Sequence, residues 1–103
     1  MFTPRNQNEQ TDRLVNALLA LENAEETYRF LEDVLTIQEM KSITQRLEVA
    51  VMLRAKETYQ EIVRKTGAST TTIGRVNRAL QYGAEGYDIV LSRLQNDPTA
   101  QQK

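Results

Sequence analysis

Apolar residues recur at intervals of three and four along most of the chain, which is the spacing of one face of an α-helix. No apolar–polar alternation long enough for a strand accompanies them, and both prolines lie near the termini, where they interrupt no helix. The pattern therefore predicts an all-α fold of about six helices. These helices are expected around Leu14–Leu21, after Asn23 to Leu35, after Thr36 past Leu53, over 58–66, after Ser69 to about Gln81, and around Tyr87–Leu94.

Polar residues at the pattern boundaries predict how the helices begin. Asn23 and Ser69 can each cap one helix, and Thr36 with Glu39 has the form of a capping box that starts a long one. The apolar residues of this long helix that we expect to face inward are Ile37, Met40, Ile43, Leu47, Ala50, Val51 and Leu53.

Residues 59–78 meet the requirements of a helix-turn-helix, two short helices joined by a tight turn. Gly67 supplies a residue that tolerates positive φ at the turn, and Ala68 keeps the turn close. The inward-facing residues expected before and after the turn are Ile62, Val63, Ile73, Val76 and Leu80. Four consecutive residues, 69–72, are Ser or Thr, which are poor helix formers and suit the start of a helix that reads DNA.

The residues that remain on the outer side of this motif have the chemistry of DNA contacts. Small hydroxyl side chains and free N–H groups at a helix N-terminus suit phosphates and base edges, and arginine binds phosphate or guanine. Gly74 would allow close approach to the groove. The predicted DNA-binding residues are Lys65, Ser69, Thr70, Thr71, Gly74, Arg75 and Arg78.

Composition narrows the function classes. The 103 residues contain no Cys and no His, which excludes disulfides and cysteine chemistry and removes the commonest general base and metal ligand. We expect no catalytic residues, no metal and no required cofactor. The apolar runs are too short for a membrane helix and the N-terminus has no signal-peptide pattern, so we expect a cytoplasmic protein without membrane contact.

The net charge of the whole chain is −1, which at first argues against a nucleic acid as the binding partner. The charges are polarised, however. Residues 54–78 hold six basic and two acidic residues, a net charge of +4, whereas residues 1–36 hold three basic and seven acidic ones, a net charge of −4. The basic segment coincides with the helix-turn-helix, which favours double-stranded DNA as the partner.

The domain organisation expected is a flexible arm over residues 1–9, one helical domain over 10–95 with the helix-turn-helix at about 58–81, and a flexible tail over 96–103. The first helix has a wide apolar face that includes Leu14, Val15, Leu18 and Leu19. A chain this short cannot easily bury such faces alone, so the pattern favours a homodimer over a compact monomer with exposed leucines.

Two other function classes remain open. The motif could be a plain helical hairpin that recruits another protein without binding DNA, which an apolar surface over residues 69–78 would favour; the sequence has Ser, Thr and Arg there. A small helical enzyme would have to gather Arg46, Arg75, Glu39 and Glu48 in one anionic pocket, and no paired acid–base or nucleophile pattern supports it.

Over about residues 10–95 the chain resembles the tryptophan repressor family, in a branch of repressor-like regulators. Two stretches carry the resemblance: Leu35-Thr36 with Glu39, Ile43 and Arg46, and Gln60-Glu61-Ile62 through Gly67-Ala68 to Thr72-Ile73 and Arg75. The resemblance implies six helices, an intertwined homodimer and repression of transcription in the cytoplasm.

The resemblance also implies a pocket for a small, amino-acid-like effector between the long helix and the recognition helix. The matching positions are Thr36, Arg46, Thr72 and Arg75. The tryptophan-binding member has glycine where this chain has Val76 and serine where it has Ala79. Because a β-branched side chain at 76 crowds the indole space, the sequence disfavours tryptophan as the corepressor.

Overall fold

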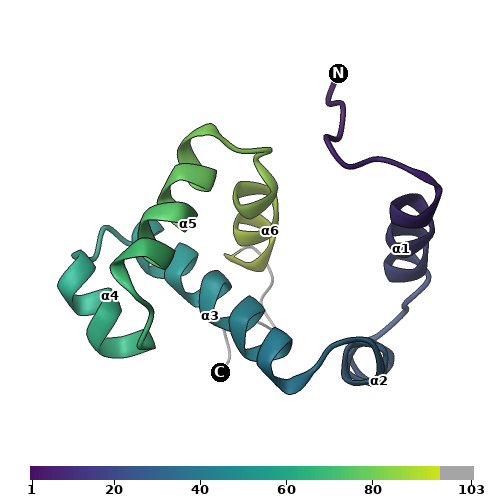
Figure 1. The fold of residues 1–103 in the computed structure, drawn as a ribbon, viewed down its shortest axis with the longest axis horizontal. Helices are drawn as coiled ribbons and strands as arrows, with labels where there is room; N and C mark the ends of the chain where they lie inside the picture. Colours follow the sequence, from purple (N-terminus) through teal and green to yellow (C-terminus); the bar gives the residue numbers. More distant parts are fainter. Residues whose placement is uncertain (96–103) are drawn as a thin grey trace. The chain divides into compact units, whose positions relative to one another are not determined.

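The computed structural model describes residues 1–95, which form six α-helices and no strand, as the apolar pattern predicted. The predicted tail at 96–103 lies outside the described residues. The chain divides into two compact units, Met1–Met40 and Lys41–Lys103. Each unit is described by itself. The helices are α1 (Glu9–Leu19), α2 (Ala24–Val34), α3 (Ile37–Arg54), α4 (Tyr59–Thr66), α5 (Thr70–Tyr82) and α6 (Gly86–Gln95) (Figure 1).

The first unit contains α1, α2 and the start of α3, each begun by a polar cap. Asn8 and Thr11 form a reciprocal capping box on α1, so the helix begins at Glu9, at the edge of the predicted arm. Asn23 caps α2 through its side-chain oxygen, which accepts from the Glu26 N–H. Neither of these two fully described helices contains a buried residue.

Two apolar residues assigned to helices lie just beyond the helix ends. The prediction placed Leu21 in the first helix, but α1 ends at Leu19, because the next helix needs Asn23 in extended backbone as its cap. Leu35 was placed in the second helix, but its backbone is extended and it ends α2, immediately before the cap of α3.

Thr36 and Glu39 form the capping box that their spacing predicted. The Glu39 N–H donates to the Thr36 hydroxyl oxygen (3.1 Å), and the Thr36 N–H donates to the Glu39 carboxylate (2.9 Å). Two backbone donors at the start of α3 are satisfied in this way.

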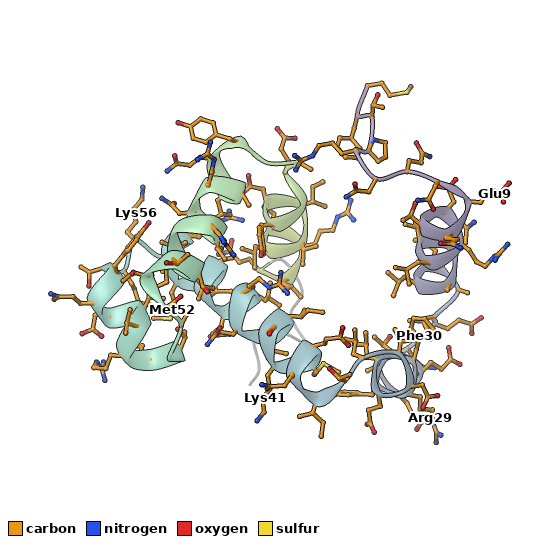
Figure 2. The ribbon with its side chains drawn as sticks, viewed as in Figure 1. Glu9, Arg29, Phe30, Lys41, Met52 and Lys56 are labelled. Carbon is orange, nitrogen blue, oxygen red and sulfur yellow. The ribbon has the colours of Figure 1, made fainter. Side chains whose placement is uncertain are left out.

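The second unit contains the hydrophobic core of the described chain. Figure 1 shows α4, α5 and α6 around the C-terminal half of α3, and Figure 2 shows the labelled Met52 in this part of the fold. Leu47, Leu53, Leu80 and Tyr87 pack against the core from its edge. The buried core residues are Val49, Ala50, Met52, Ile62, Ala68, Ile73, Val76 and Leu91.

The predicted inward face of α3 is wrong in part. Ile37, Ile43 and Val51 are 77%, 46% and 41% exposed, whereas Val49 and Met52, which the prediction left out, are buried. Apolar residues occur almost all round this helix, so its sequence does not identify the side that packs on α4–α6. In α4, Val63 is also exposed, and Ile62 alone fills the core position before the turn.

Candidate nucleic-acid interface

The turn between α4 and α5 has the geometry that a helix-turn-helix requires. Gly67 ends α4 with φ 73°, and its N–H donates to the Val63 carbonyl oxygen (2.9 Å). Positive φ is costly for residues with a side chain, which explains glycine here. Ala68 is buried and its N–H donates to the Thr66 hydroxyl (3.1 Å), so the chain turns within three residues.

A long-range hydrogen bond ties this turn to α3. The side-chain amide of Gln45 donates to the Thr66 carbonyl oxygen (3.1 Å), across 21 residues of sequence. Thr66 also donates its hydroxyl proton to the Ile62 carbonyl (2.7 Å). The carbonyl of the last residue of α4 is therefore satisfied, and the turn is held against the helix that forms much of the core.

Ser69 caps α5, the predicted recognition helix. Its hydroxyl oxygen accepts from the Thr72 N–H (3.1 Å) and its proton is donated to the Thr72 hydroxyl (3.1 Å). Both hydroxyl groups are thus used in capping, whereas Thr70 and Thr71 are exposed on the first turn. Thr70 and Thr71 also have backbone N–H groups without an intrahelical acceptor, because the first turn of any helix lacks them. Such a turn favours an anion such as a phosphate.

Ion pairs divide the basic residues of segment 54–78 into two groups. Three of them have carboxylate partners: Arg54 with Asp88 (3.7 Å), Arg64 with Glu61 (2.7 Å) and Lys65 with Glu57 (2.9 Å). The remaining three have no carboxylate within 4 Å anywhere in residues 1–95. They are Lys56, which Figure 2 shows extending from the chain after α3, and Arg75 and Arg78 on α5.

The Arg64–Glu61 pair is also visible in the acid–base properties of α4. The hydrogen bond and positive charge of Arg64 hold the pKa of the Glu61 carboxyl below its ordinary value, and Glu61 in turn raises the pKa of Arg64. Glu61 is therefore charged at neutral pH and partly neutralises Arg64. The unpaired positive charge of the motif consequently lies on α5.

Most of the predicted DNA-binding residues lie on α5. Thr70, Thr71, Arg75 and Arg78 are exposed on α5, and Gly74 lies half-buried among them. Ile73 and Val76, on the opposite side of the helix, are buried in the core as expected. Lys65 lies on α4, where Glu57 partly neutralises its charge (2.9 Å).

A cavity of about 370 Å³ lies between α3, α5 and α6. Three of the four predicted effector-pocket residues line it: Arg46, Thr72 and Arg75. Thr36, the fourth, belongs to the unit of residues 1–40, where it caps α3. Val76 and Ala79 line the cavity too, at the positions that disfavoured tryptophan.

The sequence did not predict three residues of this cavity, nor one further surface. Ser42, Gln45 and Tyr87 also line the cavity, and no local pattern marks them. An apolar groove of about 720 Å³ lies beside it. The groove is lined by Ile43, Arg46, Leu47, Ala79, Ala84, Gly86, Tyr87 and Val90.

The described residues were searched for metal sites and for membrane-spanning helices. Within residues 1–95 no group of three or more Asp, Glu, His or Cys side chains is placed to hold a metal ion. A search of the same residues finds no helix with the length and apolar character needed to cross a membrane.

Comparisons with known proteins identify the family to which this helical architecture belongs. The family model described as "Trp repressor protein" matches residues 9–95. The uncharacterized protein YerC of Bacillus subtilis (strain 168) is 49% identical over 90 residues, which are 87% of this chain and 86% of YerC.

Two crystal structures are similar over nearly the whole chain. A TrpR-like protein from Eubacterium eligens ATCC 27750 is 52% identical with a TM-score of 0.83, covering 86% of this chain and 92% of that one. A putative Trp repressor from Staphylococcus aureus is 43% identical with a TM-score of 0.83, covering 88% of this chain and 91% of that one. The chain thus belongs to the Trp repressor family.

Proposed function

We propose that this protein is a sequence-specific DNA-binding regulator of transcription, a repressor, that works in the cytoplasm as a homodimer. One observation carries the proposal: the two arginines on the exposed face of α5 have no carboxylate partner in residues 1–95, whereas the arginine and lysine at the end of α4 are paired. Free guanidinium groups along the exposed face of a helix form a surface for phosphates and base edges. Membership of a regulator family supports the same function.

Unburied apolar surface supports the homodimer. In the first unit, Leu14, Leu18 and Tyr28 are 45%, 44% and 66% exposed. In the second, the groove along α3 and α6 is mainly apolar and includes the exposed Val90. A second copy of the chain would cover both surfaces, and a two-fold axis would present two recognition helices to successive major grooves about 34 Å apart.

The proposal is tested by duplex binding. The purified dimer, offered a random-sequence duplex library at low salt, should enrich one sequence with two symmetric half-sites, and its affinity should fall steeply as salt rises. Binding of no duplex at any salt concentration, by a protein that is folded and dimeric, would refute the proposal. That result would favour the alternative, a helical protein–protein interaction module without DNA binding.

We also propose that the cavity between α3, α5 and α6 binds a small amino-acid-like effector. Arg46 and Arg75 line it, and neither has a carboxylate partner in the described residues. Two unpaired guanidinium groups suit a carboxylate ligand. Because Arg75 also lies on the exposed face of α5, an occupant would act directly on the recognition helix.

A thermal-shift screen of amino acids and small carboxylates tests this pocket. A ligand at 100 times its Kd stabilises the folded state by about 2.7 kcal/mol, which raises Tm by several degrees. Arg46→Ala should abolish the shift, whereas Lys41→Ala, on the same helix and outside this cavity, should keep it. Tryptophan should give no shift, because Val76 narrows the cavity. A shift that survives Arg46→Ala, or no shift with any compound, would contradict the effector proposal.

A further inference from the structure

Gly74 lies in the interior of α5, where neither backbone nor packing explains a glycine. Its φ is not positive, and a Cβ built on it meets nothing within 4 Å in the structure. Gly67 and Gly83 differ: Gly67 has φ +73°, and a Cβ on Gly83 would lie 2.5 Å from the Ala79 carbonyl oxygen. Glycine in a helix interior is less stable than alanine. The glycine at position 74 therefore points to something that approaches α5 from outside.

The surroundings of Gly74 form a shallow notch on the outer face of α5. Residues three and four positions away share a helix face, which places Thr70, Thr71, Asn77 and Arg78 around the missing side chain. Asn77 is half-buried and accepts from the Gln81 side chain (3.5 Å), whereas the other three are exposed, and Arg78 has no carboxylate partner in the described residues. The orientation is fixed because Val76, two residues further along the helix, is buried in the core on the opposite side.

The notch has the properties of a site for an apolar group. It has the depth of one methyl group, since only a Cβ is absent. The backbone N–H of Gly74, in the second turn, is used by the helix, so the notch offers no free donor to a phosphate; free N–H groups are found one turn earlier. In the major groove the C5-methyl of thymine is the apolar group that projects from a base edge, and threonine methyl groups pack against it.

We propose that Gly74 is a specificity-determining residue that receives the methyl group of one thymine in each half-site of the bound DNA, with Arg78 beside it. This inference rests on the proposed function and adds to it which base the recognition helix selects and by which atoms. The selection is steric: glycine admits the methyl group, and any larger residue collides with it.

The test uses the sequence that the wild-type dimer enriches from the random duplex library. Each symmetric thymine pair of that site is replaced by deoxyuracil, which removes only the methyl group. Deoxyuracil at one of these pairs should weaken wild-type binding about fourfold per half-site relative to the thymine site, which is the effect of losing one buried methyl group. Gly74→Ala should lose at least tenfold on the thymine site. On the deoxyuracil site it should bind within threefold of wild type, because the alanine methyl fills the vacated space.

The other thymine pairs of the same site serve as matched controls, since deoxyuracil there should leave the Gly74→Ala defect unchanged. The fold should be retained, with a Tm raised by roughly 2–6 °C because alanine favours the helix. A lowered Tm, or a changed dimer mass, would show that the fold or the dimer needs the glycine and would overturn the inference. Equal loss on thymine and deoxyuracil sites, or no loss at all, would also overturn it. Failure of wild type to enrich any sequence would instead refute the proposed function, and this inference with it.

Discussion

Replacing both Arg75 and Arg78 by alanine is expected to weaken specific DNA binding at least 100-fold. These arginines are the cations on the exposed face of α5 that have no carboxylate partner in residues 1–95, and each is exposed. A specific arginine–guanine contact contributes about 1–3 kcal/mol, so two such losses in each protomer multiply to a large effect. The measurement is a binding titration on the selected site at several salt concentrations.

The salt dependence separates two roles for each arginine. If it contacts phosphate, the slope of log K against log[salt] falls by about 0.9 for every contact removed, and all sequences lose affinity alike. If it contacts a base, the slope stays and discrimination at one position is lost. Arg78→Ala is the cleaner single variant, because Arg75 also lines the cavity.

Arg29→Ala is the matched control for the single variant Arg78→Ala. It removes one positive charge, as Arg78→Ala does, from an exposed arginine on α2, where Arg29 pairs with Glu25 (3.3 Å). Arg29→Ala should bind the selected site as wild type does. If it lowers affinity as much as Arg78→Ala, net charge explains binding and α5 has no special role.

Replacing Val90 by glutamate is expected to dissociate the dimer while the protomer keeps its helices. Val90 is 47% exposed in the single chain and lines the apolar groove along α3 and α6. A charge there costs the lone chain little, but burying an unpaired carboxylate under a second copy costs several kcal/mol, and the two-fold axis applies that cost twice. Affinity for the two-half-site duplex should fall with dimerisation, since paired binding is lost.

Ile89→Glu is the matched control for Val90→Glu. Ile89 is the neighbouring residue on α6, is 48% exposed and does not line the groove. Sedimentation equilibrium and the concentration dependence of Tm measure dimerisation in both variants, even if the free protomer is less stable. Equal dimer dissociation constants for Val90→Glu, Ile89→Glu and wild type would show that the groove is not the interface.

Features that depend on a few adjacent residues could be predicted from the sequence. The Thr36–Glu39 capping box, the Ser69 cap and the left-handed Gly67 were all expected from spacing and all occur. Each is decided within one helical turn, where backbone sterics and a single side-chain hydrogen bond dominate. The helix-turn-helix follows from them, together with the buried Ile73 and Val76.

The direction of the apolar faces could not be predicted, since Ile37, Ile43, Val51 and Val63 were expected inside and are exposed. A helix with apolar residues on most sides can bury any of them, and the choice depends on what packs against it. The Trp repressor resemblance correctly identified the family, and the dimer it implies would cover such faces. The dimer remains our proposal.

Local sequence was thus sufficient for the six helices, the caps at Asn23, Thr36 and Ser69, the tight turn and the polarised charge. Three features depended on the folded chain: which cations are paired, as Lys65 is with Glu57; which residues meet at the cavity, where Tyr87 joins Arg46; and the absence of any internal neighbour at Gly74 in the described structure. The physical reason is distance. Caps and turns are settled by contacts three or four residues apart, whereas the Lys65–Glu57 pair and the cavity join residues farther apart along the chain, whose approach is set by the packing of the core.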